Sequence, residues 1–164
     1  MTITYEKIAT TTLVSAAADI TFSTISGSYT DLVLVLGSLT TASANQRIRM
    51  QLNSDTGTTY SNTDLYGDGS SAASTRNTGN AYINTTMATT SSTIPSTVIM
   101  NFNNYSNATT FKTVVSRANT SDNYVSAIVG LWRSTSAITT IKLFCGTGNI
   151  SAGTTATLYG IKAE

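Results

Sequence analysis

The chain has 164 residues, a net charge of +1 and only 10% charged residues, and it contains no histidine. This length predicts a single domain over residues 1–164, large enough to bury a core without disulfides. Lys and Arg are scattered singly, which excludes the basic patch that nucleic-acid binding requires, and no apolar run is long enough to span a membrane. We therefore expect neither a nucleic-acid partner nor a membrane partner.

The sequence contains few of the residues that catalysis or metal binding usually requires. Without histidine, the commonest general base and the commonest transition-metal ligand are missing. The single cysteine, Cys145, excludes a multi-cysteine zinc site and is expected to be a small buried hydrophobe on a strand. Asp55, Asp64 and Asp68 lie close together in sequence, but their spacing matches no EF-hand loop. The sequence predicts no enzymatic activity, no cofactor and no metal site.

The first part of the chain alternates in the manner of strands. Residues 32–36 are apolar on both faces, which predicts a central strand covered on both sides by a second sheet or another subunit. Strands are expected at residues 4–14, 19–25, 31–39 and 46–52.

The strand at residues 46–52 has two different faces. Ile48, Met50 and Leu52 fall on one face, and Arg47 and Arg49 fall on the other. The two arginines could bind an anionic partner, but a polar strand face that bonds across strands or subunits is the favoured interpretation.

Residues 64–95 are expected to form a long polar excursion between strands, with a short pairing around residues 82–87. A loop of this length in a compact domain is usually functional or held by partners. We expect subunit or partner contacts within this excursion at Tyr66, Arg76 and Tyr82, and before it at Arg47, Arg49 and Tyr60.

The second half of the chain alternates more clearly. Tyr124 and Trp132 share one face of the strand at 124–132, where core packing or subunit contact is favoured over a sugar-stacking platform. About nine or ten short strands without a helical period predict an all-β fold, a single antiparallel β-sandwich that is jelly-roll-like. The later strands are expected at residues 96–105, 110–118, 124–132, 137–145 and 154–162.

Several segments occur in a characteristic order along almost the full chain: YEKIATTT at 5–12, ITFSTI at 20–25, YTDLVL at 29–34, RIR at 47–49, DTG at 55–57, GLWRS at 130–134, AITTI at 137–141 and ATLYGIK at 156–162. This order resembles small β-sandwich structural proteins of tailed bacteriophages, of the capsid decoration (cement), head-fibre and tail-associated types.

The resemblance implies a virion component that works by oligomerising, and it supplies no catalytic residues. The first hypothesis is a capsid decoration protein, a homotrimer on the capsid surface that stabilises the lattice of the major capsid protein or contacts another virion protein. The alternative is a tail-fibre or head-fibre domain that binds host surface glycan.

Overall fold

The chain forms two antiparallel β-sheets that pack face to face around one apolar core. The computed structural model describes residues 4–43, 45–87, 90–120 and 124–162, and these contain twelve strands and no helix. The prediction of an all-β antiparallel sandwich is confirmed, with somewhat more strands than expected.

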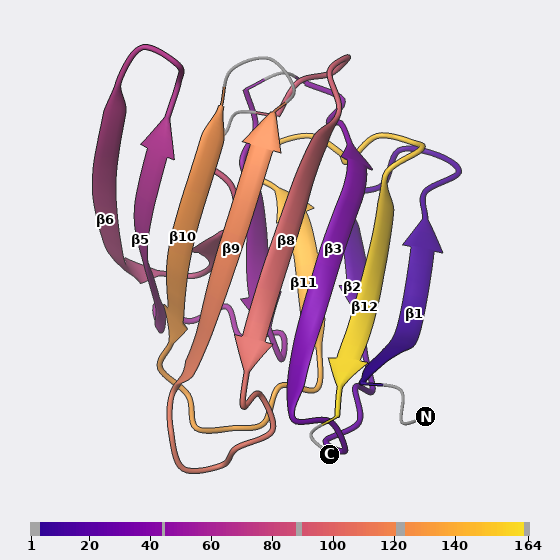
Figure 1. Ribbon diagram of the computed structural model, residues 1–164, viewed down its shortest axis with the longest axis vertical. Coiled ribbons are helices and arrows are strands. Elements are labelled where there is room, and N and C mark those ends of the chain that lie inside the picture. The colour runs from indigo at the N-terminus through magenta and orange to yellow at the C-terminus, as the bar shows by residue number, and fades with distance from the viewer. Residues whose placement is uncertain (1–3, 44, 88–89, 121–123, 163–164) are drawn as a thin grey trace.

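The larger sheet has eight strands and faces the viewer in Figure 1, with the smaller sheet behind it. Its strands, in spatial order, are β1 (Tyr5–Thr12), β12 (Thr155–Ile161), β3 (Asp31–Leu39), β8 (Ser96–Asn103), β9 (Lys112–Thr120), β10 (Val125–Trp132), β5 (Tyr60–Gly67) and β6 (Ala72–Asn80). The four-stranded sheet has the order β2 (Asp19–Phe22), β11 (Ile141–Cys145), β4 (Ile48–Leu52) and β7 (Ile83–Asn84).

The strand order is that of a jelly roll enlarged on one side. Without β5, β6, β9 and β10, the sheets reduce to β1-β12-β3-β8 and β2-β11-β4-β7. The chain then crosses to the other sheet at every step except from β4 to β7, which lie side by side in the smaller sheet. Two sheets of four strands connected in this way form a jelly roll. The four additional strands lie side by side beyond β8 and make the front sheet much wider than the rear sheet.

The core follows from the period-two alternation of the strands. Leu32, Leu34 and Leu36 of β3 are fully buried against inward-facing residues of the four-stranded sheet. The prediction that this strand and the strand ending at Trp132 supply core residues is confirmed, and so is the buried position of Cys145 in β11.

The segment at residues 64–95 differs from the expected long excursion. It contains the second half of β5, the whole of β6 and the short β7, which packs against β5 and β10. Between the sheets, Thr85 accepts a 2.6 Å hydrogen bond from Ser116, and the backbone N–H of Met87 donates to Ser126. Apolar alternation is absent from this segment because β6 is an edge strand with almost no buried side chain, and the connection after β7 is buried through polar contacts.

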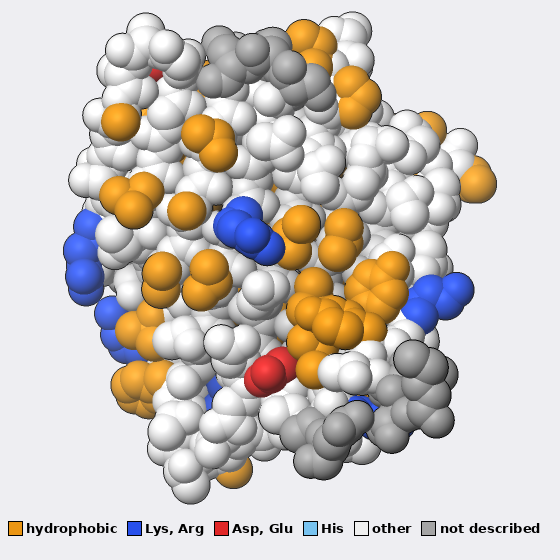
Figure 2. Space-filling view, in the orientation of Figure 1, with side chains coloured by type: hydrophobic (Ala, Val, Ile, Leu, Met, Phe, Trp, Pro, Cys, Tyr) orange, Lys and Arg blue, Asp and Glu red, His pale blue; other side chains and the backbone are white. Residues whose placement is uncertain are grey.

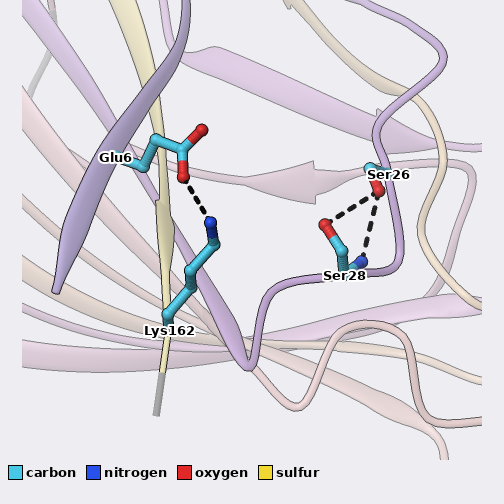
Figure 3. A network of polar contacts seen from close by, with 4 residues as sticks. All are labelled: Glu6, Ser26, Ser28 and Lys162. Carbon is cyan, nitrogen blue, oxygen red and sulfur yellow. Dashed lines mark hydrogen bonds and ion pairs between the residues drawn. The ribbon is translucent and has the colours of Figure 1, made fainter. Parts of the chain in front are cut away.

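Near the chain ends, an ion pair joins β1 to the residue that follows β12. Lys162 Nζ lies 2.7 Å from a carboxylate oxygen of Glu6, and Figure 3 shows the two side chains reaching across the sheet edge. This contact lowers the pKa of Glu6 and raises the pKa of Lys162, in each case mainly through their hydrogen bond. Nearby, Ser26 and Ser28 bond to each other within the connection between β2 and β3.

Candidate functional site

A group of cationic and aromatic side chains lies on the outer face of the four-stranded sheet, with Arg49 at its centre. Ile48 and Met50 point inward and are fully buried, so the alternation of β4 turns Arg49 outward. Arg49 Cζ lies 4.2 Å from the ring centroid of Tyr82, which is a cation–π distance. The Tyr82 ring also meets Phe144 edge-on, with the ring centroids 6.3 Å apart.

The strand register explains why these side chains meet. Arg49 lies opposite Phe144 of β11 on one side and opposite Asn84 of β7 on the other. Directly opposed residues project from the same face of a sheet. In β11, Leu143 is buried in the core while Lys142 and Phe144 are only half-buried, so both contribute to the outer face.

Lys142 extends this group, but its charge is already balanced. Its Nζ lies 5.8 Å from the ring centroid of Phe144 and 3.5 Å from the carboxylate of Asp19. We call Arg49, Tyr82, Lys142 and Phe144 the Arg49 cluster. It presents two cations, and Lys142 is the one with a carboxylate partner.

Arg49 has no corresponding partner among the residues that the structure describes. Its Nε is buried and donates no hydrogen bond. Its two terminal nitrogens form no ion pair within this part of the chain and keep access to solvent. Gly146 lies against the same guanidinium, because an added Cβ there would come within 3.1 Å of Cζ. Packing therefore holds the guanidinium in place while most of its hydrogen-bonding capacity is unused.

Of the six residues predicted to make contacts, the structure brings Arg49 and Tyr82 together and separates the others. Arg47 is half-buried just before β4. Tyr66 is half-buried near the end of β5, and Arg76 is exposed in the edge strand β6.

Tyr60 does not lie on the surface at all. Its side chain is fully buried, and its ring stacks on Trp132 with centroids 6.2 Å apart and planes 14° apart. The two residues are direct partners in the β5–β10 ladder and both face the second sheet. The expectation of a partner contact at Tyr60 is therefore corrected, and the buried Trp132 cannot act as a sugar-stacking platform.

The three aspartates near the β4–β5–β6 region each have a structural role. Asp55 accepts a 2.7 Å hydrogen bond from Trp132, and Asp64 is fully buried and accepts one from Asn62. Burial raises the pKa of Asp64, whereas backbone N–H groups of the two following serines lower the pKa of Asp68 to about 2. Over the described ranges, no three His, Cys, Asp or Glu side chains gather as a metal-binding group. The same residues include no helix that is long and apolar enough to cross a membrane.

A second candidate surface lies on the opposite side of the molecule, on the outer face of the eight-stranded sheet. Val125 and Val129 of β10 are 61% and 51% exposed, and Leu65 and Val115 on the neighbouring strands are also exposed. Val129 lies directly opposite Val115, and Ala127 lies opposite Leu65. We call these five residues the apolar outer patch. Figure 2 shows hydrophobic side chains spread over this face with few charges between them.

One end of the apolar outer patch is hollowed into a shallow groove of about 630 Å³. Its walls are almost entirely apolar, and the guanidinium of Arg117 is the one charged group on them. The outward side chains around the groove are Leu65, Ala72, Thr97, Ile99, Arg117, Asn119, Val125 and Ala127.

Two features of the sequence could have indicated these surfaces. Alternation in residues 137–145 places Ile141, Leu143 and Cys145 inward, so Phe144 must lie on the outer face, where a phenylalanine is unusual. In the same way, the strand at 124–132 is apolar on both faces, and Val125 and Val129 on one of those faces are exposed.

Comparison with known proteins gives no family assignment. No protein-family model and no curated protein matches the chain. Among solved structures, the galectin LEC-6 of Caenorhabditis elegans is 11% identical, with 94% of this chain and 96% of the galectin covered at a TM-score of 0.34. A protein of unknown function from Shewanella oneidensis MR-1 is 10% identical, with 98% of this chain and 80% of that chain covered at a TM-score of 0.21.

Proposed function

We propose that this protein is a non-enzymatic structural component of a tailed-bacteriophage virion, a capsid decoration (cement) protein that binds the lattice of the major capsid protein as a homotrimer. The observation that carries this proposal is the apolar outer patch, a group of exposed aliphatic side chains on the eight-stranded sheet. The order of sequence segments that resembles virion structural proteins supports the same conclusion.

An exposed valine-rich sheet gains free energy when a partner covers it. Full burial of one Val or Leu side chain contributes roughly 1.5–3 kcal/mol relative to exposure. Val125, Val129 and Leu65 are each more than half exposed, so most of this gain is still available to them. A symmetric assembly repeats each contact at many sites, so weak individual contacts can hold a lattice together.

Particles made with and without this protein test the proposal. We expect particles that contain it to show added surface density at regular lattice positions and to resist heating better than particles that lack it. Native mass spectrometry of the purified protein should give the mass of three chains. Loss of the protein without any loss of capsid surface density would overturn the capsid role.

A fibre domain that binds host surface glycan is the second candidate function, and the half-exposed rings of Tyr82 and Phe144 favour it. Aromatic rings on a protein surface can pack against the apolar faces of sugars. Binding of the isolated protein to host glycans, with loss of binding in Tyr82→Ala, would support this function over the capsid role.

A further inference from the structure

Arg49 is a fixed cation without a partner in the described chain. The Tyr82 ring lies 4.2 Å from its Cζ, and Gly146 lies so close to the guanidinium that an added Cβ would come within 3.1 Å of Cζ and press on it. An arginine on a free surface would lose side-chain entropy on binding a ligand. Much of that loss has already occurred in the folded protein here, so the site is preorganised for a ligand.

We infer that Arg49 is a docking point for a carboxylate group that an acidic side chain of a partner protein presents to the outer face of the four-stranded sheet. The identity of the partner as a protein rests on the proposed structural function. The assignment of a carboxylate rests on the geometry and charge of the Arg49 cluster alone.

The charge distribution favours an anion at Arg49 and not at its neighbour. The Asp19 carboxylate lies 3.5 Å from Lys142 Nζ and balances that charge. Arg49 has no acidic neighbour within ion-pair distance in the described chain, so its positive charge remains uncompensated. Since Nε is buried, the two terminal nitrogens are the atoms that can meet a ligand, and this end of the guanidinium matches the two oxygens of a carboxylate.

The arrangement of the rings favours an acidic side chain over a sugar. Arg49 covers one face of Tyr82, and Lys142 lies over one face of Phe144. The two rings are perpendicular, with 90° between their planes, so they form no continuous platform. A sugar that stacked on either of these faces would have to displace a cation, whereas a carboxylate would bind the cations where they are.

The Nε–Hε group of Arg49 provides a direct probe of binding. Because Nε is buried, its proton should exchange slowly with water and give its own signal in ¹H–¹⁵N spectra. We would titrate the full chain with a tetraglutamate peptide that is N-acetylated and C-amidated, with the tetraglutamine peptide blocked in the same way and with glucuronate. We expect a saturable shift of the Arg49 signal with tetraglutamate and none with tetraglutamine.

Two variants with a matched control identify the group responsible. Arg49→Lys keeps the charge but loses the paired donors, so tetraglutamate binding should weaken roughly tenfold or more. Arg76→Gln removes one arginine from the exposed strand β6 and should bind as the wild type does. Tyr82→Leu leaves Arg49 in the chain but removes the ring that holds it, and it should also weaken binding. If Arg49→Lys does not fold, Tyr82→Leu and the wild-type titration still test whether Arg49 binds a carboxylate.

Absence of any shift with tetraglutamate would overturn the inference. A shift that is stronger with glucuronate than with tetraglutamate would overturn the assignment to a protein partner. Either result would leave the capsid role to be judged by the particle experiments, because those do not depend on Arg49.

Discussion

The indole Nε1 of Trp132 donates a 2.7 Å hydrogen bond to Oδ2 of Asp55 and so joins the end of β10 to the turn between β4 and β5. The same carboxylate accepts hydrogen bonds from the Thr59 hydroxyl and from the backbone N–H of Gly57. These bonds, led by that of Trp132, hold the pKa of Asp55 below its ordinary value. One carboxylate therefore fixes a turn against the neighbouring sheet.

Asp55→Asn should destabilise the protein by about 1–3 kcal/mol at pH 7, because an amide has one acceptor oxygen where the carboxylate has two. The folded-state pKa of Asp55 is below 3.8, so its contribution is complete above that pH and is lost as the pH falls through the folded-state value. Urea unfolding at several pH values should show that the difference in the free energy of unfolding between wild type and variant becomes smaller below pH 3.8. Asp19→Asn serves as the control for loss of one carboxylate, because the 3.5 Å ion pair of Asp19 with Lys142 is partly exposed and should contribute little to stability. Equal stability of wild type and Asp55→Asn at pH 7 would contradict this account.

Val129→Lys should abolish binding to capsid particles while leaving the fold intact. Val129 is 51% exposed in the apolar outer patch, beside Val115, so a lysine there can reach water but places a charge in any apolar contact. Its effect on the free energy of unfolding should stay within about 1 kcal/mol, the span of strand propensities. Co-sedimentation of the variant with particles measures the binding. Val14→Lys is the matched control, since Val14 is 94% exposed and lies outside the patch. Binding by Val129→Lys at the wild-type level would remove the patch from the interface.

Burial decided which strands could be predicted from the sequence. The predicted strand at 31–39 coincides with β3, and that at 124–132 differs from β10 by one residue, because both strands are rich in apolar residues and bury several of them. β6 was missed because almost all of its side chains are exposed, and the strand exists through its ladder with β5. Alternation of apolar residues cannot indicate a strand whose side chains are not buried.

The candidate site was predicted less completely, for a related reason. Alternation placed Arg49 on an outer face correctly, but it could not show that Tyr82 would return to that face from more than thirty residues further along the chain. Tyr60 shows the opposite error, because a residue expected at a contact surface is buried. It follows a polar turn, yet its ring is in the core because its ladder partner is Trp132. Neither contact can be read from local sequence, since each depends on which strands become neighbours.

Gly130→Ala should destabilise the protein by about 1–3 kcal/mol through overpacking. A Cβ at this position in β10 would lie 2.5 Å from Cγ2 of Ile83, a fully buried residue of β7. Urea unfolding measures the decrease in the free energy of unfolding. The cost of Gly130→Ala should be clearly smaller in an Ile83→Ala background, because the colliding methyl groups are then absent. Gly37→Ala, where an added Cβ meets nothing within 4 Å, should have little effect. Similar costs in both backgrounds would show that the collision is not the cause.

Tyr60 should make stability depend on pH in the alkaline range. Burial, with a smaller contribution from the negative charge of Asp55, raises the pKa of Tyr60 to about 12. The stability associated with the neutral phenol is fully present below its ordinary pKa of 10.0 and is lost as the pH rises toward about 12, because the unfolded chain ionises first. In Tyr60→Phe the Leu52 N–H loses its 3.0 Å hydrogen bond to the phenol oxygen, which should cost about 1–3 kcal/mol at pH 7. Urea unfolding between pH 7 and 11 measures the advantage of the wild type over Tyr60→Phe in the free energy of unfolding. This advantage should become smaller above pH 10. Tyr5→Phe, which alters a tyrosine that is 56% exposed, should follow the wild-type curve. An advantage that stays constant up to pH 11 would mean that the Tyr60 phenol ionises as readily in the folded protein as in the unfolded chain.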